Sequence, residues 1–69
     1  MTGLVKRSFT LAGHRTSVAL EVEFWEALLA IALQRGQSLV ALVAAVDSAR
    51  EPGVPLASAL RVHALLSRR

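Results

Sequence analysis

The short alternating run His14–Leu20 constrains the fold most, because it ends where a helical pattern begins. Successive side chains of an extended strand point to opposite faces. One face would hold β-branched or apolar side chains: Thr16, Val18 and Leu20. The other face would hold small or charged side chains: Arg15, Ser17 and Ala19. The run therefore predicts a strand with one face on a hydrophobic core and the other free for water or a ligand.

The size of the chain predicts a partner subunit. A chain of 69 residues holds one domain, residues 1–69, and so small a core is marginally stable unless something adds to it. Cysteine is absent and only two histidines are present, which excludes disulfides and a thiolate metal site, so we expect no metal and no cofactor. The hydrophobic fraction is 54%, high for a chain with little interior. We therefore expect a homodimer in which two copies of the strand pair.

Charge is distributed unevenly along the chain. Four basic side chains lie within the first fifteen residues, which contain no acid: Lys6, Arg7, His14 and Arg15. Three of the five acids follow soon after: Glu21, Glu23 and Glu26. This distribution predicts an anionic partner for the N-terminal part. The alternative is that these cations only keep a small domain soluble.

Residues 6–20 predict a β-hairpin. Two strand-like runs, Lys6–Leu11 and Arg15–Leu20, flank the connection Ala12-Gly13-His14, and a three-residue connection containing glycine suits a hairpin. An extended arm is the alternative for the first run. Met1–Val5 is expected to be a loose terminus.

Residues 21–35 predict the first helix. The early carboxylates favour the positive end of the helix dipole, and Gly36 is placed to be the left-handed residue after its end. An apolar stripe at helical spacing is expected to face the core: Leu20, Phe24, Leu28, Ile31 and Ala32. A second stripe, which an isolated helix would not leave exposed, is expected to anchor an interface or a protein partner: Trp25, Leu29 and Leu33.

Two further helices are predicted over residues 38–50 and 55–67. Ser38 is the natural N-cap of the second helix, which is apolar almost all round and is therefore expected to be buried on several sides. The segment Glu51–Pro55 holds two prolines and a glycine and ends that helix. In the third helix, one side is expected to face the core: Leu56, Ala59, Leu60, His63 and Leu66. His63 is expected to be packed there and not to act as a ligand.

Several functional classes are excluded by the sequence. The apolar stretch Ala27–Val46 is interrupted at 34–38, which leaves no span for a membrane helix, and the N-terminus lacks the apolar core of a signal peptide. We therefore expect a cytoplasmic protein. The sequence shows none of the usual catalytic arrangements: a nucleophile beside a base, paired carboxylates in an apolar pocket, or a glycine-rich phosphate loop. We therefore expect that the protein is not an enzyme.

The ordered combination of strand, acidic helix start, Gly-x-Ser and second apolar helix resembles the ribbon-helix-helix family, which includes the Arc and methionine repressors. The matching segment is Arg15–Ala49, with Leu20–Ala32 and Arg35–Val43 as its most telling strings. The flanking strings Lys6–Ser8, Ala12–Ser17 and Ser58–Val62 are similar to a subfamily of short bacterial proteins predicted to bind DNA. The resemblance implies a mostly α fold with a short β-ribbon, an intertwined homodimer and a third, C-terminal helix.

In that family, antiparallel strands from two subunits form a ribbon that lies in the DNA major groove. The residues that would face the bases are Arg15, Ser17 and Ala19. The residues that would contact the DNA backbone are Lys6, Arg7, His14, Ser38, Leu39 and Val40, the last three through helix amides. The dimer core would comprise Val18, Leu20, Phe24, Leu28, Ile31, Leu42, Val43 and Val46. Ala19 departs from the family, which often carries a long polar side chain there.

Two alternative functions remain open. The first is a protein-interaction or scaffold module that keeps the fold but no longer reads DNA; Ala19, the modest charge and the excess apolar residues favour it. A first strand lying over Arg15 and Ser17 would support that alternative. The second is an antitoxin, which ranks lower because the chain after Glu51 predicts a compact helix and not a disordered, charged arm.

Overall fold

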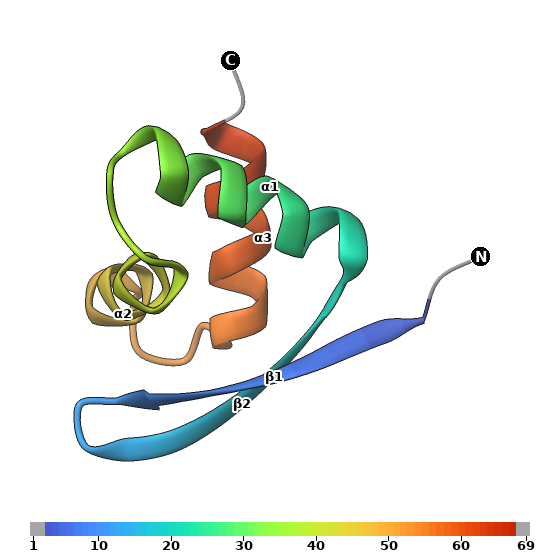
Figure 1. The fold of residues 1–69 in the computed structure, drawn as a ribbon. Coiled ribbons are helices and arrows are strands. Elements are labelled where there is room, and N and C mark those ends of the chain that lie inside the picture. Colours follow the sequence, from blue (N-terminus) through green and yellow to red (C-terminus); the bar gives the residue numbers. More distant parts are fainter. Residues whose placement is uncertain (1–2, 68–69) are drawn as a thin grey trace.

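The computed structural model describes residues 3–67 and contains a two-stranded hairpin beneath three helices (Figure 1). The elements, in chain order, are β1 (Leu4–Leu11), β2 (His14–Glu21), α1 (Val22–Gln34), α2 (Leu39–Ala49) and α3 (Leu56–Leu66). In Figure 1, α1 crosses in front of α3, and α2 is viewed end-on beside them. The predicted fold class, mostly α with a short β-ribbon and a third helix, is confirmed within these residues.

The hairpin is closed by a two-residue turn, so the predicted three-residue connection was wrong. Ala12 and Gly13 both have positive φ angles, 51° and 81°, and Leu11 is already paired with His14. Two left-handed residues give the twist that matches the right-handed twist of the flanking strands. His14 therefore belongs to β2 and not to the turn.

β1 is longer than the sequence indicated. It begins at Leu4 and pairs with β2 up to Glu21, so the expectation of a loose terminus was wrong for Leu4 and Val5; Met1 and Thr2 lie outside the described residues. The extended-arm alternative is also wrong, because the first run is paired along its whole length. Pairing satisfies backbone groups that an arm would leave to water.

The core lies between the inner face of the hairpin and the three helices. Its buried side chains come from every element: Phe9, Leu11, Val18, Leu20, Trp25, Leu28, Ile31, Ala32, Leu42, Val43, Val46, Leu56, Leu60 and Ala64. The predicted core stripe of α1 is therefore buried, with Phe24 half-buried against it. In this single chain, the residues predicted for a dimer core pack against one another and against β1.

Trp25 contradicts the sequence prediction most clearly. It was expected to anchor an interface with Leu29 and Leu33, but within this chain it is 2% exposed, whereas those leucines are 45% and 81% exposed. The reason is β1: the indole Nε1 donates a hydrogen bond of 2.8 Å to the Val5 carbonyl, and the ring lies 6.0 Å from that of Phe9. Trp25 is thus a core residue and not a docking residue.

The ends of α1 differ in how well they were predicted. Gly36 has a φ of 65° after the end of the helix, as predicted. Glu21 does not lie in the first turn: it is the N-cap residue, with extended backbone and no side-chain cap. Its carboxylate instead lies 3.1 Å from Arg61 in α3. Glu21 thus lies at the helix N-terminus, as predicted, one position before the first helical residue, and it also forms an ion pair with Arg61 that was not predicted.

The other helices are less buried than predicted. α2 exposes Val40, Ala41 and Ala45, so it is covered on one side and not on several. In α3, Leu66 was expected in the core but is 68% exposed, and Ala64 is buried in its place. His63 is half-buried, and its Nε2 atom lacks a hydrogen-bond partner. Desolvation and the nearby Arg35 charge lower the pKa of His63.

None of the individual helices in residues 3–67 has both the length and the apolar composition to cross a membrane. α1 and α2 meet the criteria only when taken together, and they are bent by 99° at their junction.

Candidate nucleic-acid interface

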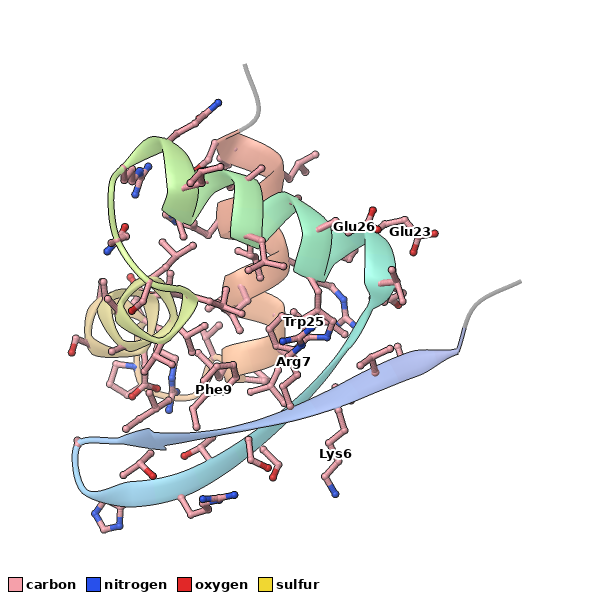
Figure 2. The ribbon with its side chains drawn as sticks, in the orientation of Figure 1. Lys6, Arg7, Phe9, Glu23, Trp25 and Glu26 are labelled. Carbon is pink, nitrogen blue, oxygen red and sulfur yellow. The ribbon has the colours of Figure 1, made fainter. Side chains whose placement is uncertain are left out.

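The outward face of the hairpin gathers polar side chains from both strands. Because directly paired residues of antiparallel strands point to the same side, the register defines one surface: Lys6, Ser8, Thr10, Arg15, Ser17 and Ala19. We call this surface the outer ribbon face. All of its members are exposed except Ala19, which is half-buried. Figure 2 shows Lys6 pointing away from the helices, while Arg7 and Phe9 point toward Trp25.

Hydroxyl groups occupy the middle of the outer ribbon face. The Oγ atoms of Ser8 and Ser17 are 3.0 Å apart across the two strands, and Thr10 lies beside Arg15 in the register. Hydroxyls both donate and accept hydrogen bonds. This part of the surface therefore suits a ligand that carries both hydrogen-bond donors and hydrogen-bond acceptors.

Two cations lie near opposite ends of the same face. Lys6 is paired with Ala19, and Arg15 is paired with Thr10. These two pairs are four positions apart along the ladder, which corresponds to about 13 Å at ~3.3 Å per residue. Glu21, at the end of β2, is held by Arg61. A backbone hydrogen bond and the Arg61 guanidinium lower the pKa of Glu21. Between Lys6 and Arg15 the outer ribbon face therefore carries positive charge and no acid, and Glu21, which is paired with Leu4 on the same side of the hairpin, lies just beyond Lys6.

Arg7 and His14 point to the other side of the hairpin. Arg7 is paired with Val18, and its guanidinium carbon lies 5.4 Å from the centre of the Trp25 ring, a cation–π arrangement. His14 is exposed and is paired with Leu11. Of the basic residues predicted near the strand, only Lys6 and Arg15 thus lie on the outer ribbon face.

The start of α2 forms a separate feature. Ser38 Oγ accepts a hydrogen bond of 3.0 Å from the Ala41 amide, so the predicted N-cap is confirmed. Val40 is 51% exposed and Leu39 half-buried. The first amides of a helix have no carbonyl one turn earlier to bind, and they can hold an anion. Phosphate binding by Ser38, Leu39 and Val40 stays a prediction.

Replacement of the cap should weaken the fold. Ser38→Ala removes the acceptor for the Ala41 amide, and the loss of such a cap lowers the free energy of unfolding by about 1 kcal/mol. Urea denaturation followed by circular dichroism measures it. Ser48→Ala is the matched control, because Ser48 is exposed inside the same helix. Equal midpoints for the two variants would show that the cap contributes nothing.

Sequence reasoning missed two members of the outer ribbon face. Ser8 and Thr10 lie on it because the register pairs them with Ser17 and Arg15. The alternation of the first run already placed Lys6, Ser8 and Thr10 together; the missing information was which strand lies beside β2. A first strand covering Arg15 and Ser17 is not observed: β1 lies beside β2, and both side chains are exposed.

Metal binding has no support in the part of the chain that the structure describes. There, no group of three or more His, Asp or Glu side chains is placed to hold an ion.

Comparison with known proteins identifies one family whose model matches this chain. The model of the ribbon-helix-helix domain matches residues 4–67, which include both strands and all three helices. Searches of curated proteins and of solved structures each found no significant match. The family match agrees with the hairpin followed by helices seen here. This chain belongs to the ribbon-helix-helix family.

Proposed function

We propose that this protein is a DNA-binding transcriptional regulator that acts as a homodimer in the cytoplasm, without catalytic activity or a cofactor. Members of the ribbon-helix-helix family are commonly DNA-binding regulators or antitoxins. The observation that carries the proposal is the outer ribbon face, which is exposed, basic and rich in hydroxyls, and whose one neighbouring acid, Glu21, is paired with Arg61. The helices lie on the opposite side of the hairpin (Figure 1).

The dimensions and chemistry of this face fit the major groove. Two strands lie about 4.8 Å apart, and a groove about 12 Å wide admits a two-stranded ribbon. Arg15 can donate two hydrogen bonds to guanine, and Ser8 and Ser17 can bond to several bases. Ala19 can only contact a thymine methyl group. Base reading would therefore rest mainly on Arg15, with Lys6 placed for a phosphate.

Charge removal on the outer ribbon face should weaken DNA binding. Electrophoretic mobility shift of a duplex over a series of salt concentrations is the measurement. Each phosphate contact contributes about 0.9 to the slope of log affinity against log salt. Because a homodimer carries two copies of Lys6, Lys6→Gln should make that slope shallower by about 1.8. Arg15→Gln should cost about 1 to 3 kcal/mol of discrimination at each guanine that it contacts.

Arg35→Gln is the matched control, because it removes the same charge from a residue that lines the groove between α2 and α3. It should leave the affinity near that of the wild type. Equal losses in all three variants would mean that only net charge matters. No binding to any duplex at low salt would overturn the proposal.

A protein partner is the second candidate, supported by leucines that the chain leaves uncovered. Leu33, Leu65 and Leu66 are 81%, 63% and 68% exposed, and one α1–α3 groove is lined by both apolar and acidic side chains. Burial of such side chains would stabilise a complex. A chain that binds no DNA but associates with a second protein, losing that association on Leu65→Asp, would favour this role.

A further inference from the structure

A groove with a volume of ≈ 420 Å³ lies between α2 and α3, and its lining residues come from these helices and from the two loops that flank α2. Sites for small ligands commonly measure about 300 to 1,000 Å³. α2 adds little bulk to the wall, because it contributes Ala45 and Ala49, one turn apart. α3 contributes Val62 and Leu66, which are 51% and 68% exposed. The groove is therefore mostly apolar and large enough for a small molecule.

Two side chains bring unpaired nitrogen donors to this groove. Nε2 of His63 is shielded from water and has no hydrogen-bond partner among residues 3–67, and folded proteins rarely leave a buried polar atom in that state. Arg35 lines the same groove, is exposed, and forms no ion pair within those residues. Desolvation, together with the Arg35 charge, lowers the pKa of His63. The guanidinium therefore lies near an imidazole that is uncharged at neutral pH.

The charges at the opposite end of the groove differ from those around His63. Arg50 donates to Asp47 and to the Val54 carbonyl, at 2.8 Å each, so its guanidinium is already held. Glu51 follows it in the loop after α2 and also lines the groove. On α3 that end is marked by Ser58, and His63 lies five residues later, about 7.5 Å along the helix at ~1.5 Å per residue. An anionic group is therefore favoured at the end that holds Arg35 and His63.

We propose that the groove between α2 and α3 binds a small organic carboxylate with an apolar body, of the kind represented by a medium-chain fatty acid. The carboxylate accepts hydrogen bonds from Arg35 and from Nε2 of His63, since one carboxylate can accept from two donors at once. The hydrocarbon chain covers Ala45, Ala49 and Leu66. Exposed side chains such as Arg35 and Leu66 change rotamer rapidly, which admits the head group to the imidazole. His63, expected from the sequence only to be packed, becomes a ligand-binding residue.

Titration with octanoate tests the proposal, and octanamide, which has the same shape without the charge, is the matched ligand. Proton–nitrogen correlation spectra of the labelled protein should show saturable shifts at the amides of Ala45, Val62 and His63. The affinity should rise by up to about fourfold for each CH₂ added from butanoate to octanoate. Octanamide should bind about fivefold more weakly than octanoate, because it lacks the charge that Arg35 attracts.

Two substitutions remove the donors. Arg35→Gln should weaken octanoate binding about threefold to fivefold, since an exposed ion pair is modest in strength. His63→Leu should weaken it about tenfold or more, because a shielded donor to a charged acceptor contributes more. The same His63→Leu variant should have a higher urea midpoint than the wild type, since it no longer buries an unpaired nitrogen. Lost binding in a more stable chain separates a ligand-binding role from a structural one.

A third substitution tests the place of the apolar body. Ala45→Leu fills the groove from α2 and should abolish octanoate binding. Ala41→Leu is the matched control, because Ala41 is exposed one turn earlier on the same helix and does not line the groove. It should bind octanoate as the wild type does, and circular dichroism shows that both variants are folded.

Three results would overturn the proposal. The first is the absence of saturable shifts at the groove, and the second is octanamide binding as tightly as octanoate. The third is a set of NOEs between labelled and unlabelled chains at Ala45 and Val62 without octanoate, which would show that a second copy fills the groove. None of these measurements uses DNA, so the proposed function is tested separately.

Discussion

Leu28→Ala should remove a large part of the free energy of unfolding of this chain. Leu28 is 0% exposed in the centre of α1, and a buried Leu→Ala change costs about 2.7 to 5 kcal/mol through lost burial and the cavity left behind. A domain of this size has a free energy of unfolding of only about 3 to 10 kcal/mol, at ~0.05 to 0.15 kcal/mol per residue. Far-ultraviolet circular dichroism with urea denaturation is the measurement.

Leu33→Ala is the control, because it makes the same chemical change in the same helix at a side chain that is 81% exposed. Its free energy of unfolding should stay within about 0.5 kcal/mol of the wild-type value. The comparison also bears on the second candidate function. If Leu33→Ala destabilised the chain as much as Leu28→Ala, Leu33 would be covered in solution by a second copy, and the monomer alone would not describe the stable species.

The features that the sequence predicted well depend on local chemistry. The stripe that includes Leu28 follows from helical periodicity, the end of α1 from the left-handed Gly36, and the start of α2 from the Ser38 cap. The sides taken by Arg15 and Ser17 follow from the period of a strand. Each of these depends on residues within one or two turns, so the sequence carried the information.

The features that it predicted badly depend on contacts between distant segments. Trp25 was expected at an interface but is buried within the chain, where Phe9 of β1 packs near its ring and Val5, twenty residues earlier, accepts its hydrogen bond. The hydrogen bond from Arg61 to Glu21 joins residues that are forty positions apart along the chain. Such contacts are set by how the hairpin packs against the helices, which no local pattern records. The DNA-facing role of the hairpin was predicted from family resemblance and stays a prediction.

The packing of Trp25 against β1 can be separated into its parts by two substitutions. Trp25→Ala removes a buried ring on which Phe9 packs and over which Arg7 lies, and such a loss costs about 3 to 5 kcal/mol. Trp25→Phe keeps an aromatic ring but removes the donor to Val5, which should cost only about 1 kcal/mol. The expected order of stability is therefore wild type, Trp25→Phe, Trp25→Ala.

Limited trypsin digestion reports whether the loss is felt at β1 itself, because Lys6 and Arg7 are cleavage sites within that strand. In Trp25→Phe, cleavage after these residues should accelerate more than cleavage after Arg50 at the end of α2, since the weakened contact holds β1 and local opening exposes its backbone. If cleavage accelerated equally at all sites, the variant would be unfolding globally. The indole would then have no specific role in holding β1. Preferential cleavage in β1 would show that Trp25 fixes the strand on which the two-stranded outer ribbon face depends.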